Sequence, residues 1–357
     1  MRTTVSSCVP ARRPETADAA APAAGERYHP RARLDTSFAP PPWLRGGHLQ
    51  SILPSLPWRR PMVEHRARPM IAASIERRID CGDGTILQGF EASPSRAGHV
   101  TVLLHGWEGS ARSLYVLSLA QTLFERGHDL VRLNLRDHGA THHLNRELFH
   151  SCRLPELLGA LRAIQAAAGG RQLDLVGFSL GGNFMLRAAA AARDAGLTVG
   201  RAIAISPVLD PAGTLVALEH GSPLYHRYFI HKWSRSLAKK QQAWPGEYDF
   251  SGLRSQRGLR RMTAALVSAH TGFATLEEYL DGYALTGERL ARLEVPATII
   301  TALDDPIIPA ADLSRLAAPD ALQVVLTPHG GHCGFLSSLM TPSWADRRVA
   351  AMLAQAR

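Results

Sequence analysis

Residues 173–183 hold the pattern that most restricts the fold of this chain. An apolar run typical of a buried strand, Leu173-Asp-Leu-Val176, leads into Gly177-Phe-Ser-Leu-Gly181, and a helix-forming stretch follows. A serine flanked by glycines at this spacing predicts a sharp, strained turn between a strand and a helix, where side chains at 177 and 181 would collide with the backbone. The turn would present the Ser179 hydroxyl beside the first free N–H groups of the helix, which can bind developing negative charge.

The acid that such a serine requires is expected after a later strand. A serine nucleophile needs a histidine as its base and a carboxylate that orients the histidine. Residues 297–301 read as a buried strand that ends at the pair Asp304-Asp305 and a proline-bounded turn. Asp305 is the preferred acid because it lies four residues before Pro309, the usual spacing after this strand. Asp304 is the alternative and would otherwise belong to the turn.

The histidine is expected in the glycine-rich loop that follows the next strand-like run, residues 323–327. This loop reads Pro328-His-Gly-Gly-His-Cys-Gly-Phe335. His332 is the preferred base because glycines lie close on both sides and Phe335 supplies an apolar anchor, whereas His329 is interpreted as a loop residue. Two histidines at this spacing could also suggest zinc, but a third ligand is not evident nearby, so no metal is expected. We therefore expect a triad of Ser179, Asp305 and His332 in this chain order.

An anion-binding site for this reaction needs a second backbone donor from an early loop. Residues 99–104 read as a core strand, and His105-Gly106-Trp107 follows directly. Gly106 allows the backbone to turn its amides inward, so the expected pair of oxyanion donors is the N–H of Trp107 and the N–H of Leu180.

Together these motifs resemble those of the YheT-like branch of the α/β-hydrolases, a branch related to eukaryotic abhydrolase-domain esterases and phospholipases. The resemblance covers roughly residues 40 to 355. It rests on the segments Gly47-His-Leu-Gln-Ser51, His105-Gly-Trp-Glu-Gly-Ser110, Gly177-Phe-Ser-Leu-Gly-Gly-Asn183, Asp304-Asp-Pro306 and Leu326-Thr-Pro-His-Gly-Gly-His-Cys-Gly-Phe335. The resemblance implies hydrolysis of a carboxylic ester by Ser179, Asp305 and His332.

The order of the predicted elements indicates the fold class. Strand-like and helix-like runs alternate from residue 99 to residue 205, which predicts an α/β-hydrolase fold with a mostly parallel central sheet flanked by helices. Two earlier runs, residues 74–80 and 85–91, surround a Gly-Asp-Gly turn and predict an antiparallel hairpin at the edge of the sheet.

Three kinds of segment are expected along the chain. Residues 1–40 are rich in Pro, Ala and Arg and are predicted to form a disordered basic tail. Residues 41–210 and 293–357 are predicted to form the core of the fold. In residues 211–292 the alternation stops, and this helical, polar stretch is interpreted as a cap or lid with the substrate pocket beneath it.

Aromatic and basic residues are concentrated in the predicted cap. Their spacing is helical, and the packing face of a helix is the preferred interpretation over the lining of an acyl pocket. The stretch Lys232 to Lys240 is interpreted as a solvated face. The aromatic residues concerned are Tyr225, Tyr228, Phe229 and Trp233.

Charge, hydropathy and cysteine usage restrict the partners. The formal net charge of +9 comes mainly from residues 1–70, which hold 11 Arg against 5 Asp and Glu. Nucleic-acid binding through this segment is an alternative, but no nucleic-acid partner is expected. No run approaches the roughly 18 apolar residues of a transmembrane helix. The cysteines at 8, 81, 152 and 333 are dispersed, which is consistent with a cytoplasmic location.

The leading hypothesis is a serine carboxylesterase that needs no cofactor and acts on a small-molecule ester, lipid-like esters included. Thioester hydrolysis and acyl transfer would use the same triad and remain alternatives. A non-catalytic binding protein on the same fold is the alternative from another functional class. The oligomeric state is left open.

Overall fold

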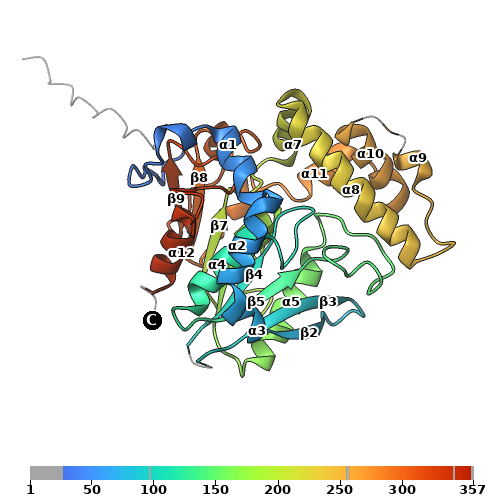
Figure 1. Cartoon of the computed structure of the whole chain (residues 1–357). Coiled ribbons are helices and arrows are strands. Elements are labelled where there is room, and N and C mark those ends of the chain that lie inside the picture. The colour runs from blue at the N-terminus through green and yellow to red at the C-terminus, as the bar shows by residue number, and fades with distance from the viewer. Residues whose placement is uncertain (1–26, 96–97, 255, 257, 341, 355–357) are drawn as a thin grey trace, which may run out of the picture.

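A nine-stranded central sheet with helices on both faces forms most of the structure (Figure 1). The structure is a computed structural model that describes residues 27–95, 98–254, 256, 258–340 and 342–354. The strand order is β1-β9-β8-β7-β6-β4-β5-β3-β2. From β1 to β5 in this order all neighbours pair in parallel. The prediction of a mostly parallel α/β fold is therefore confirmed. The parallel strands are β1 (Ala32–Leu34), β4 (Val100–Leu104), β5 (Asp129–Asn134), β6 (Leu173–Phe178), β7 (Val199–Ile205), β8 (Ala297–Ala302) and β9 (Leu322–Thr327).

The predicted hairpin lies at one edge of the sheet. Strands β2 (Ile75–Asp80) and β3 (Ile86–Ala92) pair antiparallel, and β3 pairs antiparallel with β5. The turn between them contains Gly82 and Gly84, both with positive φ, which glycine adopts at little cost.

Helices cover both faces of the sheet because successive strand residues point to opposite sides. In β4, Leu103 joins a core with α4 (Leu114–Phe124) and α12 (Trp344–Ala354), whereas Leu104 joins a core with α5 (Leu154–Ala167) and α6 (Leu180–Ala190). Short N-terminal elements precede the hairpin, and three of them contact α4: η2 (Leu53–Ser55), α2 (Arg60–Arg66) and α3 (Arg68–Ala72). The others are η1 (Pro42–Leu44), α1 (Gly47–Ile52) and η3 (Pro57–Arg59).

Between β7 and β8 the chain forms a group of helices that lies to one side of the sheet (Figure 1). Two of the longer helices begin with side-chain caps, Asp210 before α7 and Ser222 before α8. We call this group, residues 211–292, the helical insertion. It consists of α7 (Pro211–His220), α8 (Pro223–Ala243), α9 (Ser251–Arg254), α10 (Leu259–His270), α11 (Leu276–Asp281) and η4 (Glu288–Leu290); η5 (Ala310–Arg315) follows β8.

The predicted boundary of the N-terminal tail at residue 40 is too late in the chain. Residues 1–26 lie outside the described residues, but Ala32–Leu34 pair with β9 as strand β1. Phe38 is buried and its ring lies 5.5 Å from that of Trp344. The free edge of β9 and an apolar contact therefore order a segment whose composition suggested disorder.

The basic stretch of α8 is not simply solvated as the sequence suggested. Lys240 is 1% exposed, and its ammonium group donates to the Asp137 carboxylate at 2.9 Å. It also donates to the carbonyl oxygens of Asn145 and Glu147. This buried, fully paired cation fixes the C-terminal half of α8 to the loop after β5.

Candidate active site

The turn between β6 and α6 holds Ser179 in a strained conformation, with φ at 52° and ψ at −119°. The backbone approaches so closely here that side chains do not fit on either side. A Cβ at Gly177 would lie 2.3 Å from the carbonyl oxygen of Gly181, and one at Gly181 would lie 2.4 Å from that of His105. Glycine at both positions is therefore a requirement of the turn.

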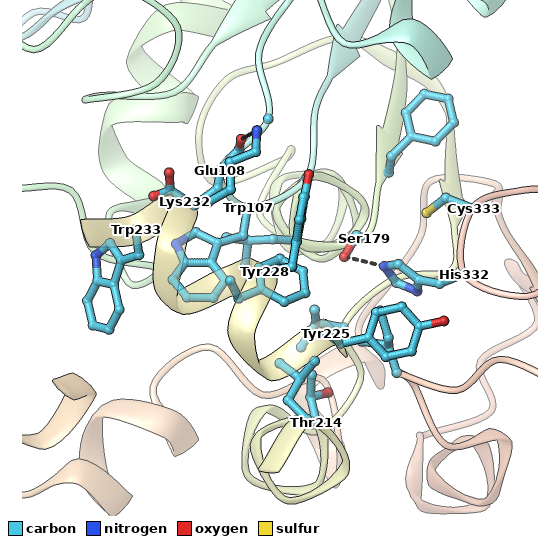
Figure 2. Close-up of a pocket in the computed structure, with 18 of the residues that line it drawn as sticks. Trp107, Glu108, Ser179, Thr214, Tyr225, Tyr228, Lys232, Trp233, His332 and Cys333 are labelled. Atoms are coloured by element: carbon cyan, nitrogen blue, oxygen red, sulfur yellow. Dashed lines mark hydrogen bonds between the residues drawn. The ribbon is translucent and has the colours of Figure 1, made fainter. Parts of the chain in front are cut away.

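Ser179, His332 and Asp305 form one line of hydrogen bonds, of which Figure 2 shows the contact between Ser179 and His332. The Ser179 hydroxyl lies 2.9 Å from Nε2 of His332, and Nδ1 of His332 lies 2.9 Å from Oδ2 of Asp305. The other carboxylate oxygen of Asp305 accepts the backbone N–H groups of Ile307 and Ile308. Burial lowers the pKa of His332, but its interactions with Cys333 and with the Asp305 carboxylate outweigh burial and raise the pKa well above 6.5.

Asp304 and His329, the two alternative residues, lie together and outside this line. Oδ1 of Asp304 accepts the N–H of Gly331 at 2.8 Å, and Oδ2 lies 3.6 Å from Nδ1 of His329. Both residues therefore hold the loop that carries His332.

The loop after β4 directs two backbone groups in opposite directions. The carbonyl oxygen of Gly106 accepts from the His105 ring at 2.7 Å and from the N–H of Gly109 at 3.0 Å. The N–H of Trp107 belongs to the same planar, trans peptide unit and so points the opposite way. Neither this N–H nor that of Leu180 has a hydrogen-bond acceptor in the described part of the chain.

An N-terminal segment supports the loop that carries His332, a role that the sequence analysis did not assign. The hydroxyl of Ser51 accepts the His332 N–H at 2.8 Å, and Gln50 exchanges hydrogen bonds with the backbone of Leu336. A Cβ at Gly334 would lie 2.0 Å from the carbonyl oxygen of Gln50. The sequence held one signal of this role, which is the resemblance of Gly47–Ser51 to the family pattern. A family motif that lies far from the triad in the chain is expected to contact the site in the fold.

A cavity of about 630 Å³ extends from Ser179 between the sheet edge and the helical insertion. The aromatic residues of α8 were predicted to form the packing face of a helix. They do pack, but they also line this cavity, so that prediction was incomplete. Phe229 stacks on Trp107 with ring centroids 5.3 Å apart. Trp233 meets the same ring edge-on (Figure 2). Tyr225 and Tyr228 line the cavity beside them.

Charged groups gather at the wall of the cavity next to Trp107. Burial raises the pKa of Glu108 to about 7, and the ammonium of Lys232 donates to the Glu108 carbonyl at 3.1 Å (Figure 2). Burial also lowers the pKa of Lys232. Most other lining residues are apolar or aromatic. The site therefore combines an apolar space with a small polar wall near the serine.

Comparisons with known proteins show the family to which the chain belongs. A model of the α/β hydrolase fold matches residues 100–339. The chain is 28% identical over 314 residues to the candidate esterase YheT of Escherichia coli (strain K12), with 85% of this chain and 88% of YheT covered. This match confirms the resemblance to YheT-like proteins.

Two further relatives are more distant. The chain is 22% identical over 251 residues to the phospholipase ABHD3 of Mus musculus, with 67% of this chain and 58% of that protein covered. Among solved structures, the serine hydrolase CCSP0084 from Cycloclasticus zankles superposes with a TM-score of 0.52 at 16% identity. That superposition covers 79% of this chain and 98% of the other, and it shows a shared fold.

Proposed function

Because the chain belongs to the α/β-hydrolase family, we propose that it is a serine hydrolase that cleaves carboxylic esters through an acyl-enzyme. The observation that carries this proposal is the pair of 2.9 Å contacts from Ser179 to His332 and from His332 to Asp305. Proteins use this constellation to convert a weakly nucleophilic hydroxyl into an effective one at neutral pH.

Acylation begins when Oγ of Ser179 attacks the ester carbonyl carbon and its proton passes to Nε2 of His332. Asp305 holds the Nδ1–H and stabilises the imidazolium that forms. The carbonyl oxygen becomes negatively charged and accepts the N–H groups of Trp107 and Leu180. His332 then gives the proton to the leaving alcohol as the C–O bond breaks.

Deacylation repeats these steps with water as the nucleophile. His332 takes a proton from water, the hydroxide oxygen attacks the acyl carbon, and the same backbone amides hold the oxyanion. The proton returns from His332 to Oγ of Ser179 as the carboxylic acid leaves. These reaction steps need no cofactor.

The cavity supports an ester with an extended apolar part as the substrate. Its volume of about 630 Å³ lies within the range that holds small-molecule ligands. We propose that the helical insertion acts as the cap, because its helices α7, α8 and α10 contribute residues to the wall of the cavity that contains Ser179. The names of the relatives, a candidate esterase and a phospholipase, also support the ester class.

A fluorophosphonate probe and a p-nitrophenyl ester series test the proposal. Wild type is expected to be labelled and to turn over, whereas Ser179→Ala is expected to lose labelling and on the order of 10⁴-fold or more of kcat. Ser55→Ala is the matched control, because Ser55 is an exposed serine at the same cavity. Labelling that persists in Ser179→Ala would overturn the assignment of the nucleophile.

A further inference from the structure

The cavity opens to solvent between the N-terminal elements and helix α8. Pro57 and Arg60 line it from one side, and Leu224 and Tyr228 line it from the other. Although they line the cavity, Leu224 and Tyr228 are 55% and 47% exposed to solvent. His48 on α1 donates to or accepts from the Tyr225 hydroxyl at 3.0 Å, which brings the two sides together. We call the solvent-exposed residues around this opening the rim.

Large apolar side chains are exposed on the short N-terminal elements that flank the opening. Trp58 is 52% exposed next to Pro57, and Leu49 is 44% exposed on the helix that contacts Tyr225. Single exposed apolar residues are common, but a group around one opening marks a surface that meets another phase or molecule.

The outward face of α8 adds positive charge to the rim. Arg227, His231 and Arg235 follow Leu224 at helical spacing and are exposed. The helix contains five Lys and Arg but no Asp or Glu. The N-terminal side has the same bias, since residues 36–63 contain three Arg and no Asp or Glu.

This distribution changes the interpretation of the basic N-terminal seventy residues. Residues 1–26 contain three Arg and three Asp or Glu, and so carry no formal net charge. The whole excess of the first seventy residues therefore lies in residues 27–70, which the structure describes and which hold eight Arg against two Asp or Glu.

The positive charge of the rim is only partly neutralised within the molecule. Arg60 pairs with Glu64 at 2.8 Å. Arg227 and Arg235 form no salt bridge with a carboxylate of the described residues. A partner for this surface must therefore be anionic as well as apolar.

We propose that the rim docks on an anionic lipid surface. Trp and Tyr side chains favour the boundary between water and lipid, and basic residues around them are attracted to anionic headgroups. A second copy of the chain would bring the same positive charges together, which opposes self-association through this face. The exposed aliphatic side chains and the opening between them favour a lipid surface over a nucleic acid.

Docking in this orientation would place the opening of the cavity against the lipid, so that an apolar ester could enter without crossing water. The inference goes beyond the proposed function, because binding does not require Ser179. Its test therefore uses the full chain with Ser179→Ala, which keeps the rim and cannot alter the vesicles by hydrolysis.

Sedimentation with lipid vesicles tests the proposal. The Ser179→Ala chain is expected to bind vesicles of phosphatidylcholine and phosphatidylglycerol, to bind pure phosphatidylcholine much less, and to be released by salt. The pair Arg227→Glu and Arg235→Glu is expected to weaken binding at least about tenfold. Trp58→Ser is expected to weaken it by removing the apolar contact. Arg162→Glu and Ile75→Ser, exposed residues on α5 and β2, are the matched controls and should not change binding.

Several results would overturn the proposal. These are failure to bind anionic vesicles, equal loss in the control variants, binding of single-stranded DNA in preference to vesicles, or self-association that the Trp58→Ser change abolishes. Turnover of p-nitrophenyl acetate by the wild-type chain is measured separately. Binding without turnover would contradict only the proposed function, and turnover without binding would contradict only the docking surface.

Discussion

The backbone N–H of Leu135 donates a hydrogen bond to Nε2 of His105 at 3.2 Å. Burial lowers the pKa of His105 well below 6.5, so the ring is neutral. Because Nε2 accepts, the single ring proton lies on Nδ1 and is donated to the carbonyl oxygen of Gly106. His105 thereby fixes the orientation of the peptide unit that carries the N–H of Trp107.

His105→Ala is expected to lower kcat about 10²-fold with a smaller change in KM, because the Trp107 donor loses its fixed direction. His105→Asn retains an N–H donor and should recover part of the loss. Steady-state kinetics on a short p-nitrophenyl ester check this, with thermal melting as the control for folding. Equal losses in both variants would argue against a positioning role for the donor.

The two neighbouring aspartates should differ strongly in their effects. Asp305→Asn is expected to lower kcat on the order of 10³- to 10⁴-fold, because it removes the carboxylate that holds the charged form of His332. Asp304→Asn keeps an oxygen that can accept the Gly331 N–H, so it should cost less than about tenfold. The ratio of the two kcat values is the measurement, and a larger loss at 304 would reassign the acid.

The dependence of activity on pH follows from the pKa of His332. The ring must be neutral to accept the Ser179 proton, so kcat/KM should fall as the pH falls through this pKa. Since the pKa is raised, the midpoint of the acidic limb is expected above 6.5. Asp305→Asn removes one cause of the increase and should move the residual activity's midpoint to lower pH. A wild-type midpoint below 6.5 would contradict the electrostatic argument.

Ser51→Ala tests the support of the loop that carries His332. The His332 N–H would lose its acceptor, and we expect a loss of about tenfold in kcat with little change in the midpoint of the pH profile. Ser51→Thr keeps a hydroxyl and should recover activity. The rate of fluorophosphonate labelling gives a second measure, because it reports the reactivity of Ser179 without turnover.

Lys240→Met is expected to lower the free energy of unfolding by about 3–5 kcal/mol, because it leaves the Asp137 carboxylate buried without its cation. The neighbouring Lys239 is exposed, so Lys239→Met should change the free energy by less than about 0.5 kcal/mol. Urea unfolding of both variants checks this. Similar stability of the two variants would show that the buried pair contributes little.

Local sequence patterns were sufficient for the central part of the fold. The strand predicted over residues 297–301 is observed at Ala297–Ala302, since a short apolar and β-branched run bounded by a proline and a turn defines it. Strand β1 could not be predicted in this way. Three residues cannot display a period, and the reason for their order is the edge of β9, nearly three hundred residues away.

In the candidate site, too, local patterns predicted some features and could not predict others. The turn at Ser179, the acidic strand end and the histidine loop each have a local signature, and the structure brings them together. The supporting contacts of Gln50 and the burial of Lys240 join distant segments. No local pattern distinguishes a buried lysine from a solvated one when its carboxylate lies about one hundred residues away.

The dependence of the His332 loop on residues 50 and 51 affects when the site can exist during synthesis. The contact of Gln50 with Leu336 spans 286 positions, and that of Ser51 with His332 spans 281. A growing chain therefore carries Ser179 long before its base can be positioned, and such distant contacts form late in folding. In the proposed mechanism Ser179 lacks its base until the loop after β9 is in place, and it reaches full activity only when the N-terminal segment supports that loop. Full ester hydrolysis would therefore report a late stage of folding.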